Sequence, residues 1–194
     1  MLHFFKEFVF KLQTLYFFVI VIVMSNIKLI KLSSVFDEDI YNMLQTIEDR
    51  ENGFSNPAYK LNRTDYRKWL KEQEKHSKGE SLPENWVPYT TYILFDKKIP
   101  VGFARIRHES SKHLETIIGA GNLGYAIAKG YRGKGYGTTL FSLLLKECKT
   151  FGYEKIKLFP HKDNTPTIKI MLKHGGKVLG DFNEEKAIIE IEIK

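Results

Sequence analysis

A glycine-rich loop between an apolar strand and an apolar helix constrains this chain more than any other feature. The loop spans residues 130–137, GYRGKGYG, and combines four glycines with two cations. Such a loop leaves backbone N–H groups free at the start of the next helix, where the helix dipole favours an anion. Glycine also lets the backbone approach a phosphate closely. We therefore expect a loop that binds a pyrophosphate, rather than a tight turn in which glycine only relieves crowding.

Two common phosphate-binding motifs do not fit this loop. A P-loop has Gly-Lys followed by Ser or Thr, with another glycine five residues before the pair. Here Lys134 is followed by Gly135, and position 128 is alanine. A dinucleotide-binding loop has the spacing Gly-x-Gly-x-x-Gly near the start of a βαβ unit. In this chain the third glycine, Gly137, comes one residue too early, and the loop lies late in the sequence.

The loop instead fits the pattern Arg/Gln-x-x-Gly-x-Gly/Ala at every fixed position from Arg132 to Gly137. An apolar strand precedes it, and a segment that begins at Asn164 and ends at Gly176 follows it. This ordered set resembles the acetyl-CoA-binding region of the GNAT superfamily (GCN5-related) of N-acetyltransferases, clearly over residues 101–180 and weakly before them. The resemblance implies the acyl-CoA N-acyltransferase fold, an α/β domain with a mixed, mostly antiparallel central sheet flanked by helices.

The spacing of apolar residues predicts the elements of this fold. Strands are expected at residues 27–32, 89–95, 100–108, 123–128, 155–159 and 186–193. Helices are expected at 37–51, 65–77, 137–151 and 165–174, with Thr64 as N-cap of the second. Residues 110–122 form a loop or a short helix. The order βααβββαβαβ, with one strand near the end expected to be split, fits a mixed sheet better than a doubly wound one.

The resemblance also implies which residues hold acetyl-CoA. The backbone at the end of strand 123–128 would pair with the pantetheine arm, and one N–H of this strand would polarise the thioester carbonyl. Backbone N–H groups of the loop would bind the pyrophosphate, with its two cations as charged supplements. Asn164 would contact the pantetheine arm or simply cap its helix. The predicted set is Ile127, Ala128, Arg132, Gly133, Lys134, Gly135, Tyr136, Gly137 and Asn164.

The sequence departs from the family at the position of the usual proton donor. Many members have a tyrosine seven residues after the asparagine, where it can protonate the leaving thiolate, but this chain has Met171. Gly176 likewise replaces a usual phenylalanine. Tyr125 and Tyr131 are nearby candidates for the missing acid, and the sequence does not choose between them.

Two residues are candidates for the base that deprotonates the acceptor amine. His108 ends the strand 100–108, near the point where the sheet should open toward substrate, and an imidazole has a suitable pKa. Glu115 follows in the next segment and could act through a water molecule. Arg107 could orient a substrate carboxylate, and Tyr125 is a second candidate for substrate contact.

Composition narrows the possible partners. The net charge is +7, but lysines alternate with acids and no base-stacking motif is present, so we expect no nucleic acid partner. The single cysteine, Cys148, cannot form an intramolecular disulfide and is expected to be a buried thiol. No cluster of Cys and His has the spacing of a zinc site, so no metal is expected.

Residues 1–23 look foreign to the domain that follows them. The uncharged stretch that ends at Met24 is shorter than the roughly 20 residues of a membrane span. Three interpretations stay open: a translated leader before a native start at Met24, a short helix that contacts a membrane, or a helix packed on the domain. In each case residues 24–194 form the single catalytic domain.

The expected function is transfer of an acetyl group from acetyl-CoA to a primary amine of a small molecule, peptide or protein, by direct attack in a ternary complex. The rival is a non-catalytic acyl-CoA-binding regulatory module. We expect a cytoplasmic monomer or homodimer whose partners are CoA and the amine acceptor. Membrane contact is expected only if residues 1–23 are retained.

Overall fold

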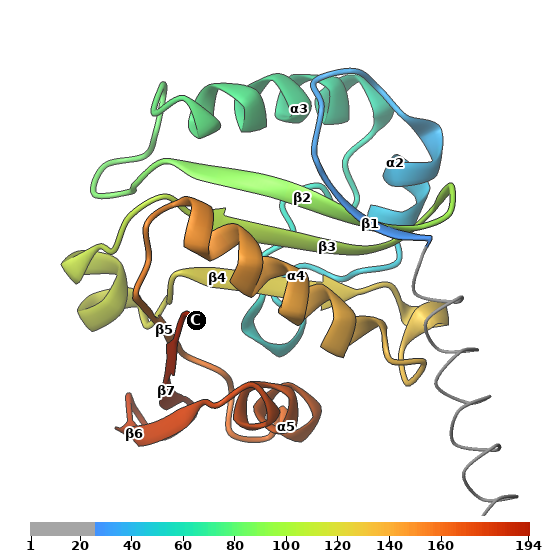
Figure 1. The fold of residues 1–194 in the computed structure, drawn as a ribbon. Coiled ribbons are helices and arrows are strands. Elements are labelled where there is room, and N and C mark those ends of the chain that lie inside the picture. Colours follow the sequence, from blue (N-terminus) through green and yellow to red (C-terminus); the bar gives the residue numbers. More distant parts are fainter. Residues whose placement is uncertain (1–25) are drawn as a thin grey trace, which may run out of the picture.

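The computed structural model describes residues 26–194, so the predictions made for residues 1–23 lie outside the described part of the chain. Two antiparallel sheets form its centre (Figure 1). The larger sheet has the order β1 (Ile27–Lys31), β2 (Tyr89–Asp96), β3 (Ile99–Arg107) and β4 (Leu123–Ile127). The smaller sheet has the order β5 (Lys155–Leu158), β7 (Ala187–Glu192) and β6 (Lys177–Asp181).

Helices cover both faces of the larger sheet. The helices of the described residues are α2 (Glu38–Leu44), α3 (Arg63–Ser77), α4 (Tyr136–Thr150) and α5 (Thr165–Lys173). Short turns lie at η1 (Glu51–Gly53), η2 (Leu114–Ile118) and η3 (Lys129–Tyr131). In Figure 1, α4 crosses one face of the larger sheet, α2 and α3 lie on the other side, and α5 packs beside the smaller sheet. This is the predicted mixed α/β fold with an antiparallel sheet flanked by helices.

The sequence of α4 explains its position. Leu140, Leu144 and Cys148 recur every four residues, and all three are fully buried against the larger sheet. Each buried leucine contributes about 1.5–3 kcal/mol to stability. The prediction of a buried thiol is confirmed, and burial raises the pKa of Cys148 to about 12. The helix that follows the glycine loop is therefore anchored firmly along its length.

Two predicted helices differ in detail, and the split expected near the end of the chain is present. The helix predicted at 37–51 ends at Leu44, because the buried Asn56 amide donates hydrogen bonds to the carbonyls of Leu44 (2.9 Å) and Ile47 (2.6 Å) and holds a turn there. The predicted N-cap Thr64 is wrong, since the Asn62 side chain accepts from the N–H of Asp65 (3.0 Å) and the helix begins at Arg63, two residues before the predicted start. The strand expected to be split near the end is present as β6 and β7.

Hydrogen bonds join the two sheets between Asn122, directly before β4, and Lys157 in β5. The N–H of Lys157 donates to the side-chain oxygen of Asn122 (2.7 Å), and the N–H of Asn122 donates to the carbonyl of Lys157 (2.9 Å). A Cβ at Gly121 would lie 2.0 Å from that carbonyl oxygen, so only glycine permits the approach. Beyond this point β4 pairs only with β3 and β5 only with β7, so the two strands diverge.

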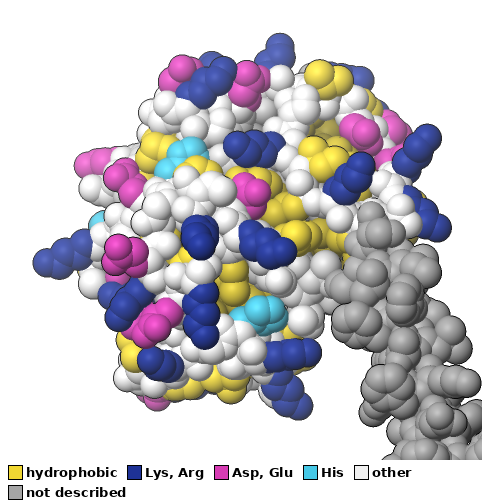
Figure 2. Space-filling view, in the orientation of Figure 1, with side chains coloured by type: hydrophobic (Ala, Val, Ile, Leu, Met, Phe, Trp, Pro, Cys, Tyr) yellow, Lys and Arg dark blue, Asp and Glu magenta, His cyan; other side chains and the backbone are white. Residues whose placement is uncertain are grey.

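On the face shown in Figure 2, lysine and arginine side chains are interspersed with acidic ones. Between residues 26 and 194, no helix has both the length and the apolar character needed to span a bilayer.

Candidate functional site

A cavity of about 1250 Å³ opens where β4 and β5 diverge. Its walls come from both sheets, from the start of α4, from α5 and from residues 50–55, which cross over β4. The Phe54 ring lies so close to the strand that a Cβ at Gly124 would approach it to 2.7 Å. The volume exceeds that of most small-molecule sites. Six of the nine predicted cofactor-binding residues line it: Ile127, Arg132, Gly133, Gly135, Gly137 and Asn164.

The glycine loop presents an open backbone to this cavity. Gly133 and Gly135 have positive φ angles of 74° and 86°, a region that side chains rarely tolerate. A Cβ at either position would meet nothing within 4 Å. Gly135 is the N-cap of α4 and supplies no side-chain hydrogen bond, so the first N–H groups of the helix have no side-chain cap. Backbone donors and the helix dipole together favour an anion at this position.

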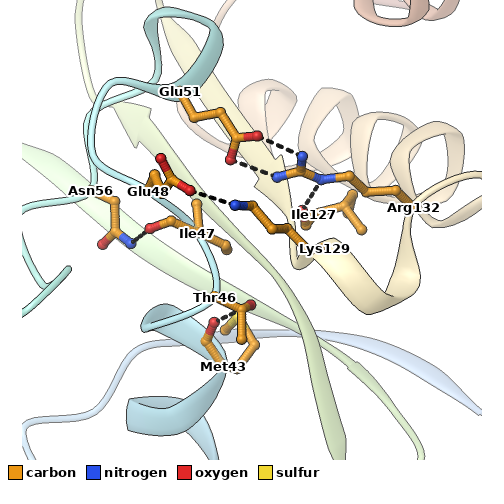
Figure 3. Close-up of polar contacts among 9 residues, drawn as sticks. All are labelled: Met43, Thr46, Ile47, Glu48, Glu51, Asn56, Ile127, Lys129 and Arg132. Carbon is orange, nitrogen blue, oxygen red and sulfur yellow. Dashed lines mark hydrogen bonds and ion pairs between the residues drawn. The ribbon is translucent and has the colours of Figure 1, made fainter.

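Arg132 is engaged within the protein rather than free in the loop. Its guanidinium makes a two-pronged ion pair with Glu51 (2.6 and 2.8 Å) and donates from Nε to the carbonyl of Ile127 (2.9 Å). A second ion pair joins Lys129 to Glu48 (Figure 3). The Arg132 guanidinium lowers the pKa of Glu51 below its ordinary value. Through these contacts with Glu51 and Ile127, Arg132 holds residues 48–53 against the end of β4.

Two other predicted loop residues, Lys134 and Tyr136, do not line the cavity. The ammonium of Lys134 donates to the carbonyl of Gly130 (2.9 Å) and thereby braces the loop. The Tyr136 hydroxyl donates to Asp96, at the far end of β2. Any contact of these two residues with a phosphate would therefore be made by their backbone.

The free edge of β4 faces the cavity with a defined set of backbone groups. Ala128, predicted to bind the cofactor, is buried and donates its N–H to the carbonyl of Val101 (3.0 Å) in β3. Because backbone N–H groups alternate between the two edges of a strand, the N–H groups of Ile127 and Tyr125 point to the opposite, unpaired edge. These two residues can donate to a ligand that lies between β4 and β5, whereas Ala128 cannot.

Asn164 lines the cavity and also caps α5. Its side-chain oxygen accepts from the N–H of Thr167 (3.3 Å), which is the capping role left open from the sequence. Met171, on the same helix, is buried and lines the cavity, so no hydroxyl stands at that position. Gly176 also has a packing reason, because a Cβ there would lie 2.8 Å from the carbonyl of Met171.

Neither predicted base reaches the cavity. His108 lies on the α4 face of the sheet, where its ring stacks on Phe151 (4.6 Å between centroids) and its Nε2 lies 2.8 Å from the Thr90 hydroxyl. Burial lowers its pKa. Glu115 is paired with Lys157 (3.1 Å) outside the cavity lining. The geometry gives no support to a catalytic role for either residue.

Other titratable side chains do line the cavity. Among the histidines of residues 26–194, His161 is the one in the lining, where it lies against Gly53. Tyr125 packs on Phe141 (5.5 Å between centroids), and burial raises the pKa of its hydroxyl to about 12. Tyr131, the other candidate acid, is not in the lining. His161 carries no sequence signal beyond its place three residues after the end of β5 and was missed.

Two arginines of β3 form the end of the cavity away from the glycine loop. Arg107, predicted to contact substrate, lines the cavity, and so does Arg105, which the sequence analysis missed. Residues two apart on a strand share a face, and on β3 that face also carries Phe103, which packs under α2 and α3. The signal for Arg105 was present, since two arginines at i and i+2 interrupt an otherwise apolar strand.

Acidic and thiol groups of the described residues do not gather into a metal site. No cluster of three or more His, Cys, Asp or Glu side chains with suitable geometry occurs within residues 26–194.

The chain matches a known protein family and is similar in fold to solved structures. A family model described as the acetyltransferase (GNAT) family matches residues 55–175. No curated protein sequence matches the chain. A GNAT-family acetyltransferase from Streptococcus pneumoniae is similar in structure, with a TM-score of 0.59 and 16% identity over 87% of this chain and 99% of that one.

Similar solved structures include complexes with acetyl-CoA. The microcin C7 self-immunity acetyltransferase MccE, in complex with acetyl-CoA and AMP, has a TM-score of 0.63 and 16% identity over 87% of this chain and 93% of that chain. The N-acetyltransferase PseH from Campylobacter jejuni, in complex with acetyl coenzyme A, has a TM-score of 0.57 and 12% identity over 87% and 99%. At these identities the likeness is one of fold.

Proposed function

The chain belongs to the acetyltransferase (GNAT) family, and from that premise we propose that it is an N-acetyltransferase that uses acetyl-CoA to acetylate a primary amine. One observation carries the proposal. The glycine loop and the uncapped start of α4 face the same cavity as the unpaired edge of β4. CoA has two parts that match these features. Its pyrophosphate suits the glycine loop and the start of α4, and its extended, amide-containing pantetheine arm suits the unpaired edge of β4.

The residues of β4 would orient the acetyl donor. The pantetheine amides pair with the free strand edge at Ile127 and Tyr125, and an N–H of this edge donates to the thioester oxygen as negative charge develops there. The acceptor nitrogen then attacks the carbonyl carbon, so that a C–N bond forms while the C–S bond breaks. The sulfur leaves with the bonding electron pair, and the nitrogen gives up one proton.

Two cavity residues are suited to handle these protons. We assign His161 as the candidate proton acceptor, because it lines the cavity and imidazole nitrogens are the commonest general bases in enzymes. Tyr125 also lines the cavity and carries a hydroxyl, which makes it the candidate proton donor to the leaving thiolate. His161→Gln and Tyr125→Phe should therefore lower kcat more than they weaken acetyl-CoA binding.

Calorimetric titration of acetyl-CoA into the full chain, with NAD and ATP as controls, tests the cofactor. Selective binding of acetyl-CoA supports the proposal, and preference for NAD or ATP contradicts it. Release of free CoA thiol in the presence of a panel of amines, with mass spectrometry of the products, tests the transfer itself.

A non-catalytic acyl-CoA-binding module is the second candidate, and Met171 is the observation that favours it. The buried thioether cannot donate a proton to a thiolate. Binding of acetyl-CoA without turnover of any amine would decide for this alternative.

A further inference from the structure

We propose that the acceptor carries an oxyanion, a carboxylate or a phosphate, in addition to its amine, and that Arg105 and Arg107 bind this group. The inference rests on the proposed function, because it names the class of acceptor for the same cavity. The position of the two arginines, their burial and the lack of acidic partners each support it.

The arginines lie at the acceptor end of the cavity. In the register of β3 and β4, Arg105 is opposite Gly124, and the N–H of Arg107 donates to the carbonyl of Asn122 (2.9 Å). The glycine loop begins beyond Ile127, at the other end of β4. At about 3.4 Å per residue, Gly124 and Ile127 are about 10 Å apart. An acceptor that lies between the acetyl donor, bound near the glycine loop, and the two arginines can therefore contact both.

Arg105 is a buried charge that forms no ion pair within residues 26–194, and burial lowers its pKa, an effect that the charge of Asp49 only partly opposes. The residue is 6% exposed, and its Nε and Nη2 have no hydrogen-bond partner among residues 26–194. Its guanidinium lies over the rings of Tyr89 (4.7 Å) and Phe103 (5.9 Å). Arginine keeps its charge in proteins, so burial without a counter-ion is unfavourable. Ring faces compensate only part of this cost.

Arg107 adds a second charge beside the first. It donates to the carbonyl of Gly121 and lies 5.8 Å from the Trp86 ring, but its Nε has no partner within the described residues. Neither arginine is in an ion pair with any residue from 26 to 194. Burial, and next the charge of Arg105, lower the pKa of Arg107 to about 10.

The cavity as a whole has an excess of cations. Its lining includes six lysines or arginines and three carboxylates. One of these carboxylates, Glu51, is already held by Arg132. The guanidinium fork matches the paired oxygens of a carboxylate or phosphate, and such bonds are among the strongest polar contacts. An anionic group on the acceptor supplies the counter-charge and the hydrogen-bond acceptors that the two buried arginines lack.

The first test compares acceptors that differ only in the anion. The pairs are lysine with cadaverine, for the carboxylate, and phosphoethanolamine with ethanolamine, for the phosphate. We expect kcat/KM to be about 10- to 100-fold higher for the anionic member of one pair, the effect of one or two charge-assisted hydrogen bonds. In Arg105→Gln this ratio should fall close to one, whereas the exposed control Arg67→Gln should keep it.

The outcomes separate this inference from the proposed function. An equal or better rate with the neutral members, or a ratio that Arg105→Gln leaves unchanged, overturns the anion site while acetyl transfer stands. If no amine is turned over, melting temperatures with added glutarate and inorganic phosphate decide. A shift in the wild type that Arg105→Gln loses supports the site, and no shift, or an equal shift in the variant, overturns it.

Stability without ligand distinguishes a binding arginine from a structural one. Because an unpaired buried charge is removed, Arg105→Gln should melt at the same temperature as the wild type or higher. A clearly lower melting temperature indicates a structural arginine and overturns the inference. If Arg105→Gln does not fold, Arg105→Lys, which keeps the charge but not the fork, is assayed with the same acceptor pairs and should lose most of the ratio.

Discussion

Replacing Gly135 by alanine tests the anion site at its centre, and Gly152→Ala is its matched control. Gly135 and Gly152 flank the two ends of α4, with φ angles of 86° and 78°, and a Cβ at either position meets no atom within 4 Å. Each substitution therefore costs only backbone strain, about 1–2 kcal/mol. In a domain of this size that lowers Tm by about 2–8 °C.

The two variants should differ in ligand binding alone. The methyl group of Gly135→Ala stands in the space beside the first N–H groups of α4, where the pyrophosphate is proposed to lie. Loss of one charge-assisted hydrogen bond, worth about 1.5–3 kcal/mol, weakens acetyl-CoA binding by about 10- to 150-fold. Gly152→Ala lies at the other end of the helix, outside the cavity lining, and should bind as the wild type does.

Calorimetry of acetyl-CoA binding and thermal melts on the same three proteins provide the measurement. Equal Tm losses with weakened binding only in Gly135→Ala are expected. If Gly135→Ala binds within about two-fold of the wild type, the loop does not hold the pyrophosphate. If both variants weaken binding equally, strain transmitted through α4 explains the loss, and the argument for direct contact fails.

Three further predictions follow from the geometry. Gly121→Ala places a Cβ 2.0 Å from the Lys157 carbonyl and should cost about 1–3 kcal/mol, and an unchanged urea midpoint would refute the tight junction. Glu51→Gln should destabilise by at most about 1 kcal/mol at pH 7. Arg132 lowers the pKa of Glu51 from its ordinary value of 4.5. The difference in stability between wild type and variant should therefore be complete above pH 4.5 and disappear as the pH falls through the lowered pKa. A difference in stability that persists at acid pH contradicts the ion pair. Cys148 is fully buried with a raised pKa, so a disulfide reagent should modify it only on unfolding, and rapid reaction of the native protein would contradict its burial.

The sequence predicted those parts of the site that depend on backbone and local order. Gly133 and Gly135 could be identified from the sequence, because a backbone position with positive φ strongly favours glycine. Most strand and helix positions followed from apolar spacing, since one face of each element is buried. The end of α2 did not, because Asn56, twelve residues further on, supplies the hydrogen bond that stops the helix.

The side-chain roles could not be predicted in the same way. His108 was chosen for its chemistry and its place at a strand end, but the alternation of β3 directs it to the α4 face. The same alternation brings Arg105 to the cavity beside Arg107. Arg132 fits the motif, yet its guanidinium is held by Glu51, eighty-one residues earlier in the chain.

The sequence by itself therefore determined the fold class, the open backbone of the glycine loop and the absence of the usual tyrosine at position 171. These depend on residue type and on spacing within a few tens of residues. The tertiary structure alone decided which charges are paired and which are left facing the cavity. That choice depends on contacts between segments distant in sequence, where the free energy of a buried arginine is set by what folds against it.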